Sequence, residues 1–498
     1  MKHQPLVREQ SLASHRDEIT QIQELESVNS TFELQKKNYN LSDPPSYEAR
    51  IDRLNRIEHL CKNYIWEITE ALQNDFGCRS SDWTFTADIF SPLSHVKYVK
   101  RNLKKWMKKE KTRSGLLALS GQRTYIVNER LGVVGIMSPF NAPISLAFDP
   151  TIEAIAAGNS VMIKISEATP HTARLIKLLV AKYFDADELA VVIGDQQVSK
   201  TFASLAWDKF VFTGGSEIGK RILAAAAENL TPVILELGGK SPCVLLDDAN
   251  ITKAAEKITK VRQLNAGQVC IAGDYVLLPE NHLEHFIQTA LDISKDVYPS
   301  IINNKDFTSI IDDSAYNRIV GYIDEAKASG CRIIQSNPMD EAVPDPTTRK
   351  IPLTLIVNPA DHLMVSQCEI FGPILSIYTY ETLESAIAYI NSKEKPLALY
   401  IFGRNRKQIN KIINNTSSGG VTINDLLMHA NSKTMGFGGV GYSGMGRYKG
   451  GFIGYKAFSN PKTVFEQGLM HRFTDIFFPP YKSNTMRKVL RKQVGVTS

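Results

Sequence analysis

Short apolar runs bounded by loops recur through the first half of the chain, and they constrain its fold more than any other feature. They lie at residues 133–137, 161–165, 210–212 and 233–235. Runs of this length are typical of strands buried on both faces of a parallel sheet. A helical segment at residues 172–184 follows the second run. The pattern predicts an α/β fold with a parallel sheet between helices.

The second half of the chain repeats this alternation. Within residues 271–430, the apolar spacing is helical at 283–297 and 314–329 and strand-like at 332–334 and 397–402. Helices that alternate with strands are typical of βαβ units. We therefore expect a second domain built on its own parallel sheet.

Composition places the chain among ordinary globular proteins. It has 498 residues, 43% of them hydrophobic and 22% charged, and this length is enough for two to four domains. The 58 basic and 52 acidic residues give a net charge of +6. That excess is too mild to indicate a nucleic-acid partner.

Cysteine spacing and apolar runs bear on the compartment. The six cysteines show neither CxxC nor CxxH spacing, so we expect no disulfide framework and no metal site. A reducing cytoplasm fits this usage. The first residues lack the apolar segment of a signal peptide, and no run of 18 apolar residues occurs. We expect neither secretion nor a transmembrane segment.

A carboxylate and a thiol occupy loop positions between residues 231 and 274. Glu236 ends an apolar run and enters a glycine turn, and Cys270 follows the small and polar residues 265–268. Alone, each would be an ordinary surface charge or core side chain. As a pair they suit nucleophilic catalysis, provided that a nearby field lowers the thiol pKa and that the carboxylate is partly desolvated.

A glycine turn follows the strand at residues 210–212. A strand, a glycine turn and then a helix can place backbone N–H groups on a phosphate. The segment from Gly214 to Lys220 also satisfies the P-loop pattern GxxxxGK. The next residue is Arg221, where a P-loop needs Ser or Thr to bind magnesium. The nucleotidase alternative is therefore disfavoured.

The segments LELGGKSP (235–242) and NAGQVC (265–270) resemble two motifs of the NAD(P)-dependent aldehyde dehydrogenases in order and spacing. The resemblance implies that Cys270 attacks the aldehyde carbonyl and that Glu236 activates the water that hydrolyses the thioester. It also implies that Asn141, in SPFNAP (138–143), stabilises the oxyanion together with the backbone N–H of Cys270.

Three further segments resemble cofactor motifs of the family: KISE (164–167) at the adenine ribose, FTGGSEIG (212–219) at the pyrophosphate, with Gly215 where Ser is usual, and EIFGPILSI (369–377) at the nicotinamide. The residues carried over are Lys164, Glu167, Gly214, Ser216, Gly219, Leu237, Glu369 and Phe371. A carboxylate at position 167 repels a 2′-phosphate, so NAD is expected as the cofactor, with NADP possible.

Shorter segments resemble the class-3-like branch, and most closely the coniferyl aldehyde dehydrogenases: NDFG (74–77), RNLKKWMKK (101–109) and FPPY (478–481). An aromatic aldehyde substrate is implied, with a long-chain aliphatic aldehyde as the alternative. A catalytically silent NAD-binding member is disfavoured because Asn141, Glu236 and Cys270 are all present. The segment 435–451 departs from the family pattern, with Gly436 replacing Pro and Lys449 replacing His.

The resemblance also implies a domain plan and a homodimer paired through a small bridging sheet. The expected units are an N-terminal arm or early helix (1–40), an NAD-binding domain (41–121 and 132–238), a catalytic domain (239–430), a bridging element (122–131 and 455–482) and a basic tail (483–498).

Overall fold

The computed structural model describes residues 5–112, 121–468, 479, 488 and 491–496, with backbone only for residues 5–20 and 22. Six strands form its first sheet, in the order β15-β7-β6-β3-β4-β5. They are β3 (Val133–Ser138), β4 (Ser160–Ile165), β5 (Leu189–Val192), β6 (Lys209–Thr213), β7 (Val233–Glu236) and β15 (Gly444–Met445).

Five of these strands run parallel, which confirms the prediction from the apolar runs. The exception is β15, which pairs antiparallel with the end of β7. The sequence does not predict this strand, because two residues among glycines leave no periodic signal. This edge brings the glycine-rich segment next to Glu236, through the pair Gly444 and Glu236.

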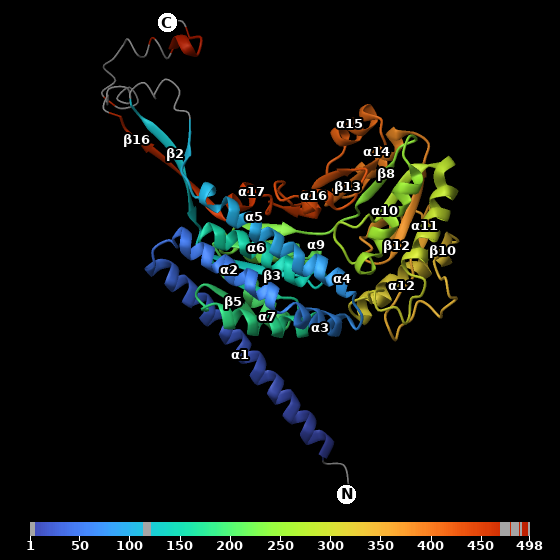
Figure 1. Cartoon of the computed structure of the whole chain (residues 1–498), viewed down its shortest axis with the longest axis horizontal. Helices are drawn as coiled ribbons and strands as arrows, with labels where there is room; N and C mark the ends of the chain where they lie inside the picture. The colour runs from blue at the N-terminus through green and yellow to red at the C-terminus, as the bar shows by residue number, and fades with distance from the viewer. Residues whose placement is uncertain (1–4, 113–120, 469–478, 480–487, 489–490, 497–498) are drawn as a thin grey trace.

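Side chains of the first sheet enter two separate cores. Val134 and Ile136 belong to one, and Val133 and Met137 to the other. Helices pack on both faces (Figure 1), which explains why the strands are apolar throughout. On one side lie α2 (Tyr47–Asn63), α3 (Ile65–Phe76), α5 (Ser91–Trp106), α6 (Pro143–Ala157) and α7 (Pro170–Tyr183), and on the other α8 (Gln196–Ser204) and α9 (Ser216–Ala227). Two short elements, α4 (Ser81–Thr84) and η1 (Phe85–Phe90), connect α3 to α5.

The polar N-terminal stretch forms one long helix, α1 (Pro5–Leu41). Figure 1 shows its first half extending away from the body of the molecule. Its second half buries Val28, Phe32 and Gln35, and the Gln35 amide donates to the backbone oxygens of Val161 (3.0 Å) and Ala186 (2.8 Å). Only these three of the helix's described side chains are buried, and one of them is a glutamine, so the apolar spacing in the sequence predicts this helix only weakly.

Seven strands form the second sheet, in the order β10-β11-β12-β9-β8-β13-β14. They are β8 (Pro242–Leu245), β9 (Tyr275–Pro279), β10 (Arg332–Gln335), β11 (Thr354–Val357), β12 (Ile374–Tyr380), β13 (Ala398–Phe402) and β14 (Gly420–Ile423). All pairs are parallel except β10 with β11, so the predicted second parallel sheet is confirmed, with one antiparallel edge.

Helices of the second half include the two predicted from apolar spacing, which are confirmed as α11 (Leu283–Val297) and α12 (Asp313–Ala328). The others are α10 (Ile251–Gln263), α13 (Met364–Gln367), α14 (Leu383–Ser392), α15 (Arg406–Asn415), α16 (Met428–Asn431) and α17 (Phe452–Ala457), with short turns η3 (Leu264–Gly267), η4 (Glu280–His282) and η5 (Gly441–Ser443).

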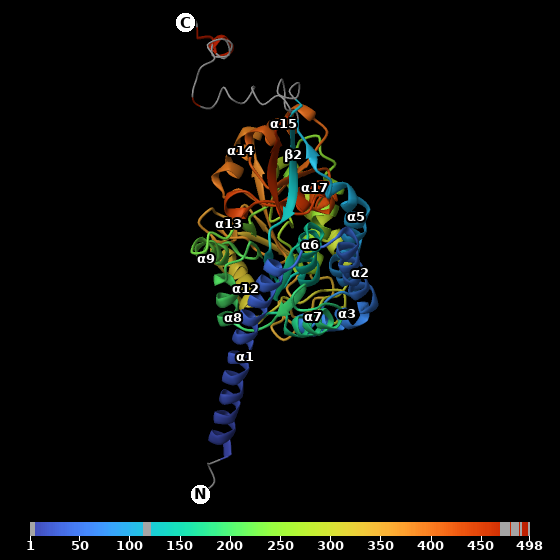
Figure 2. The ribbon, with the colours of Figure 1, turned by 90° about the vertical axis from the view of Figure 1, so that its left-hand side faces the viewer.

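A third sheet stands apart from the two domains' cores. Its long strands β2 (Arg123–Arg130) and β16 (Ser459–Glu466) pair antiparallel over their whole length, and β1 (Glu110–Lys111) adds a short edge. The two segments expected to form the small bridging sheet, 122–131 and 455–482, thus pair with each other. Figures 1 and 2 show this ribbon projecting from the body.

Within the part of the chain that the structure describes, no helix combines the length and apolarity needed to cross a membrane. Among the same residues, no three His, Cys, Asp or Glu side chains gather as a metal site requires. All six cysteines are free thiols. Most of the basic tail 483–498 lies outside the described residues.

Candidate active site

Glu236 and Cys270 face each other between the two sheets. Glu236 is the last residue of β7, and its Oε1 lies 3.7 Å from the Sγ of Cys270. The Glu236 side chain is buried, whereas Cys270 is half-buried. The carboxyl end of a parallel strand is the usual place for a reactive group in an α/β fold. The structure brings the two residues together as the sequence predicts.

The turn before Cys270 is held in an uncommon backbone conformation. Asn265, Ala266 and Gly267 all have left-handed dihedrals, with φ of 50°, 53° and 74°. A Cβ at Gly267 would lie 2.2 Å from the backbone oxygen of Gly372, so only glycine fits there. Two consecutive non-glycine residues with positive φ are strained and persist only where the surroundings hold them.

Gln268 supplies part of that support. Its Nε2 donates to the backbone oxygens of Asn265 (2.9 Å) and Ser309 (3.1 Å), and its Oε1 accepts from the N–H of Ile311 (3.0 Å). The fully bonded amide fixes the turn against the residues before α12. Cys270 therefore projects from a rigid loop.

Asn141 lies on the loop between β3 and α6 and reaches the thiol loop. Its Nδ2 donates to the backbone oxygen of Gln268 at 3.1 Å, and its side chain is buried. The structure thus brings Asn141 close to the backbone that precedes Cys270. An amide here can donate to an oxygen that forms beside the sulfur.

Both reactive groups have shifted pKa values. Burial raises the pKa of Glu236, and the Tyr448 hydrogen bond and the Lys449 charge offset part of that rise. Burial also raises the pKa of the Cys270 thiol well above its ordinary value, with the Glu236 and Glu369 carboxyls adding to the effect. The expectation of a field that lowers the thiol pKa is not met among the described residues, because burial, with the two carboxyls, raises that pKa.

Tyr448 is a site residue that sequence reasoning missed. Its hydroxyl donates to Glu236 Oε2, which also accepts from Thr213 Oγ1 at 3.5 Å. With Oε2 engaged, Oε1 is left facing Cys270. Tyr448 lies within the glycine-rich segment and reaches the site because β15 pairs with β7. Nothing in the sequence distinguishes Tyr448 from Phe437 and Tyr442, the other aromatic residues of this segment.

Lys164 and Glu167 form a pair at the end of β4. Lys164 Nζ donates to Glu167 Oε2 at 2.6 Å, with the lysine buried and the carboxylate 56% exposed. Partial burial would raise the pKa of Glu167, but the hydrogen bond from Lys164 lowers it below its ordinary value. An ionised carboxylate with free lone pairs can accept hydrogen bonds from sugar hydroxyls.

The predicted glycine turn joins β6 to α9. A Cβ at Gly215 would meet nothing within 4 Å, so the space beside the turn is open. A Cβ at Gly219 would lie 2.7 Å from Leu237, so the helix start packs directly on that side chain. Ser216 begins α9, where unpaired N–H groups favour an anion. Lys220 pairs with Glu217 at 2.7 Å rather than pointing into the turn.

Glu369 lies against the glycine turn that follows Glu236. A Cβ at Gly238 would come within 1.8 Å of Glu369 Oε2. Burial raises the pKa of Glu369 to about 8, and the Asp274 charge adds to this. Near neutral pH its carboxyl therefore keeps a proton and can both donate and accept. Phe371 packs edge-on against Phe140, with ring centroids 5.8 Å apart.

A family model described as the aldehyde dehydrogenase family matches residues 15–464. The chain belongs to the aldehyde dehydrogenase family. It is an NAD(P)-dependent oxidoreductase that acts on aldehydes. The resemblance drawn from the motifs around Glu236 and Cys270 is confirmed.

Individual relatives match this aldehyde dehydrogenase over nearly its whole length. The coniferyl aldehyde dehydrogenase of a Pseudomonas species is 41% identical over 442 residues, which cover 89% of this chain and 91% of the relative. A substrate-bound AldH of Staphylococcus aureus is 34% identical, with a TM-score of 0.87 over 94% of this chain and 99% of that one. Betaine aldehyde dehydrogenase of Staphylococcus aureus in complex with NAD+ is 26% identical, with a TM-score of 0.79 over 89% and 90%.

Lys449 of this aldehyde dehydrogenase, which replaces the usual His, joins a buried charge network behind Glu236. Its Nζ lies 2.5 Å from Asp149 Oδ2, and its backbone N–H donates to Glu153 Oε2 at 2.8 Å. His95 bridges the same two acids, with Nδ1 3.0 Å from Asp149 and Nε2 3.1 Å from Glu153. Sequence reasoning identified the substitution but not its partners.

The charges in this network stabilise one another. Burial alone would lower the pKa of His95, but its hydrogen bonds to Asp149 and Glu153 raise it above the ordinary value. Burial would raise the pKa of Asp149, yet the Lys449 charge and the His95 hydrogen bond hold it well below its usual range. The network therefore carries both signs of charge at neutral pH.

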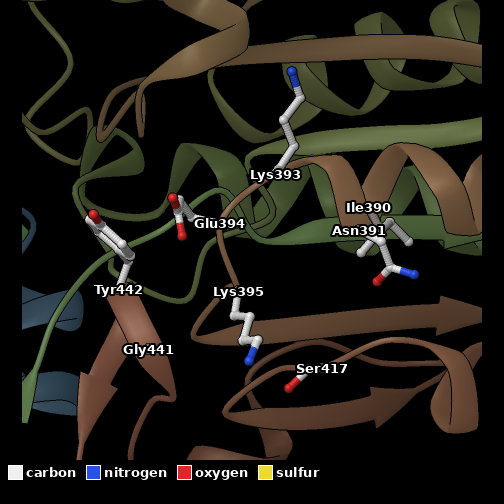
Figure 3. A pocket seen from close by; sticks show the side chains of 8 residues that line it. All are labelled: Ile390, Asn391, Lys393, Glu394, Lys395, Ser417, Gly441 and Tyr442. Atoms are coloured by element: carbon white, nitrogen blue, oxygen red, sulfur yellow. The ribbon is translucent and has the colours of Figure 1, made fainter.

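A separate cavity of about 310 Å³ lies between the end of α14 and the turn η5. Figure 3 shows its lining, which comprises Ile390, Asn391, Lys393, Glu394, Lys395, Ser417, Gly441 and Tyr442. Through Tyr442 it borders the glycine turn, because Ser216 Oγ donates to the Tyr442 backbone oxygen at 3.1 Å. None of the proposed catalytic side chains lines it.

Proposed function

We propose that this aldehyde dehydrogenase oxidises an aromatic aldehyde, of the coniferyl aldehyde kind, to the carboxylic acid with NAD+. The observation that carries the proposal is the 3.7 Å approach of Glu236 Oε1 to Cys270 Sγ beside the Asn141 amide. A nucleophile, a base and an oxyanion donor at one point are what acyl chemistry on a carbonyl requires. The Pseudomonas relative supplies the substrate class.

The first step is addition of sulfur to the aldehyde carbon. The raised thiol pKa leaves a small fraction of thiolate; its proton passes to solvent, and the sulfur then forms the C–S bond, so Glu236 stays unprotonated for the later hydrolysis. The carbonyl π electrons move to oxygen, which accepts hydrogen bonds from Asn141 Nδ2 and the backbone N–H of Cys270. Removing one such donor typically costs about 10²–10³ in rate.

The described residues fit a nicotinamide dinucleotide. Open space beside Gly215 at the start of α9 suits the pyrophosphate, the Lys164 and Glu167 pair suits the adenine ribose, and Glu369 suits the second ribose. When bound, the oxidised nicotinamide supplies the two-electron oxidant that accepts hydride from the thiohemiacetal. Leu237, packed on Gly219, and Phe371 would bound that region.

The last step is hydrolysis of the thioester on Cys270. Glu236, desolvated and with a raised pKa, accepts a proton from water as the water oxygen attacks the acyl carbon. The C–S bond breaks, the acid leaves and the thiol is regenerated. Tyr448 and Thr213 hold Oε2, so the free oxygen of the base stays directed at the acyl group.

Glu167 carries the proposed preference for NAD+ over NADP+. Its carboxylate is ionised because Lys164 lowers its pKa, and an ionised carboxylate repels a 2′-phosphate. The NAD+ bound to the Staphylococcus betaine aldehyde dehydrogenase supports the same cofactor.

Aromatic side chains near the thiol support an aromatic substrate. Phe140 precedes Asn141 and contacts the rings of Phe371 and Phe76, with centroids 5.8 Å and 6.3 Å away. Planar rings in this arrangement can stack against an aromatic aldehyde. A panel of coniferyl, benzyl-type and long-chain aliphatic aldehydes tests the proposal. Equal kcat/KM on aromatic and aliphatic members would contradict the aromatic assignment.

Cys270→Ala is the variant that separates binding from chemistry. The proposal predicts no NADH formation from any aldehyde in the panel, with NAD+ affinity close to that of the wild type. Cys243→Ala is the matched control, because Cys243 is a fully buried thiol in β8. NADH formation by Cys270→Ala at the wild-type rate would contradict the assigned nucleophile.

We further propose that the enzyme is a cytoplasmic homodimer. Six free thiols suit a reducing compartment. The strand β16 has a partner on one side only among the described strands, and a sheet edge of this kind can pair with a second copy. Light scattering at micromolar concentration tests the oligomer, and a monomer mass would contradict it.

A further inference from the structure

A buried ion pair lies beneath the proposed oxyanion site. Arg79 Nη2 is 2.8 Å from Asp88 Oδ2, and neither side chain is exposed to solvent. Arg79 follows α3, and Asp88 lies in η1. Buried ion pairs are weak contributors to stability compared with apolar replacements, so this pair calls for another explanation.

The Arg79 guanidinium reaches both loops of the site at once. Its Nη2 donates to the backbone oxygen of Asn141 at 3.1 Å, and its Nε donates to Asn265 Oδ1 at 3.3 Å. One loop carries the Asn141 amide and the other carries Cys270. The fixed fork of an arginine suits this geometry, because one planar group bridges two acceptors at a set spacing.

Asn265 links Arg79 to the strained turn before Cys270. Its Nδ2 donates to the backbone oxygens of Asn141 and Gln268, both at 3.2 Å. Asn265 is the first of the three left-handed residues before Cys270. A buried amide that bonds Arg79 on one side and the turn on the other holds the strained backbone in place.

Asp88 fixes the other end of the Asn141 loop. Its Oδ1 accepts from the backbone N–H of Ile144 at 3.0 Å and of Ser145 at 3.4 Å, in the first turn of α6. A carboxylate at a helix start is favourable because those N–H groups lack partners within the helix. The ion pair thus ties α6, the Asn141 loop and the thiol loop into one unit.

We propose that Arg79 is a positioning residue for the oxyanion site, which sets the spacing between the Asn141 amide and the backbone N–H of Cys270. This inference rests on the proposed function, in which those two groups stabilise the oxyanion. Arg79 touches neither substrate nor cofactor in this role. Its effect on rate comes through the two loops that it bridges.

Arg79→Lys is the decisive variant, because lysine keeps the charge beside Asp88 but cannot bridge two acceptors as a planar fork. A displacement of about 1 Å in a reacting group can cost roughly 10² in rate. We expect kcat for aldehyde oxidation to fall by about 10², with KM changed far less. Hydrolysis of p-nitrophenyl acetate, which passes through the same oxyanion without a dinucleotide, should fall by a similar factor.

Alkylation of Cys270 by iodoacetamide distinguishes positioning of the oxyanion site from a general structural role. If Arg79 only stabilised the fold around the thiol, the substitution would also change the rate of alkylation. The reaction forms no oxyanion, so we expect its rate in Arg79→Lys to stay near the wild-type rate. Arg50→Lys is the control: the buried Arg50 guanidinium also bridges two acceptors, the backbone oxygens of Pro45 (3.0 Å) and Ala156 (2.8 Å), but contacts neither site loop. We expect the control to keep both turnover rates.

Two results would overturn the inference. One is wild-type ester hydrolysis in Arg79→Lys, and the other is a loss of alkylation in parallel with turnover. If Arg79→Lys does not fold, Asn265→Gly decides, because glycine accepts the left-handed backbone while removing the amide that Arg79 holds. Unchanged ester hydrolysis in Asn265→Gly then overturns it. Wild-type enzyme that hydrolyses the ester but oxidises no aldehyde would contradict the proposed function alone.

Discussion

The Glu236 carboxylate and the Cys270 thiol meet at 3.7 Å although they belong to different domains' sheets. Glu236 ends a strand of the six-stranded sheet, and Cys270 lies on the loop that leads into β9 of the seven-stranded sheet. The reactive pair therefore exists only when the two sheets are packed together. Packing between sheets sets this distance, and the Tyr448 hydrogen bond sets which carboxylate oxygen is used.

Glu236→Gln should separate thioester formation from its hydrolysis. The amide cannot take a proton from water, so acyl enzyme should accumulate. We expect a burst of NADH close to one equivalent per site, followed by a steady rate reduced by about 10²–10⁴. Stopped-flow absorbance measures both phases. A normal steady rate without a burst would contradict the role of Glu236 in deacylation.

Tyr448→Phe should lower turnover and shift its pH dependence. The Tyr448 hydrogen bond lowers the raised pKa of Glu236, so removing it moves that pKa further up. The acidic limb of the kcat profile should therefore move to higher pH. A hydrogen bond to a charged group is worth about 1.5–3 kcal/mol, which corresponds to a loss of roughly ten- to a hundredfold at neutral pH. An unchanged profile would show that Tyr448 does not orient the base.

Glu167→Gln should increase the use of NADP+. Removing the ionised carboxylate removes its repulsion of the 2′-phosphate, and we expect kcat/KM with NADP+ to rise roughly tenfold. Lys164 keeps a neutral partner in this variant. Initial rates with both cofactors measure the change. If the ratio of kcat/KM with NADP+ to kcat/KM with NAD+ stays at the wild-type value, another residue sets the cofactor preference.

His95→Gln should destabilise the protein in a pH-dependent way. The folded pKa of His95 is raised, so its contribution to stability is fully present below about pH 6.5, the ordinary value, and is lost as pH rises through the folded pKa. We expect the variant to lose about 2 kcal/mol of unfolding free energy near pH 6 and less near pH 9. Urea denaturation at both pH values checks this. A deficit that grows with pH would contradict the charged bridge.

The sequence was sufficient for features that are local or that recur in a recognisable order. Fully buried strands leave uninterrupted apolar runs, and Glu236 and Cys270 stand in motifs of fixed spacing. The apolar runs predicted both parallel sheets, and the motifs indicated the aldehyde dehydrogenase family. The proximity of the two residues followed from the family resemblance rather than from periodicity.

Contacts between distant segments left no such trace. Tyr448 lies 212 positions from the carboxylate that it contacts, and Arg79 lies 186 positions from Asn265. Neither has a periodic neighbour that marks its partner. The direction of the Cys270 pKa shift also depends on folding, because it arises from burial and from the carboxyls of Glu236 and Glu369, which lie on other segments of the chain. The motif residues alone therefore do not predict the direction of this pKa shift.

The mass of the acyl enzyme shows whether Cys270 is the nucleophile that carries the thioester. Glu236→Gln mixed with coniferyl aldehyde and NAD+ is quenched in acid, digested and examined by mass spectrometry. We expect one feruloyl group, the acyl group derived from coniferyl aldehyde, per chain on the peptide that contains Cys270, and none in Cys270→Ala. An unmodified Cys270 peptide during turnover, or an acyl group on a different cysteine, would contradict it.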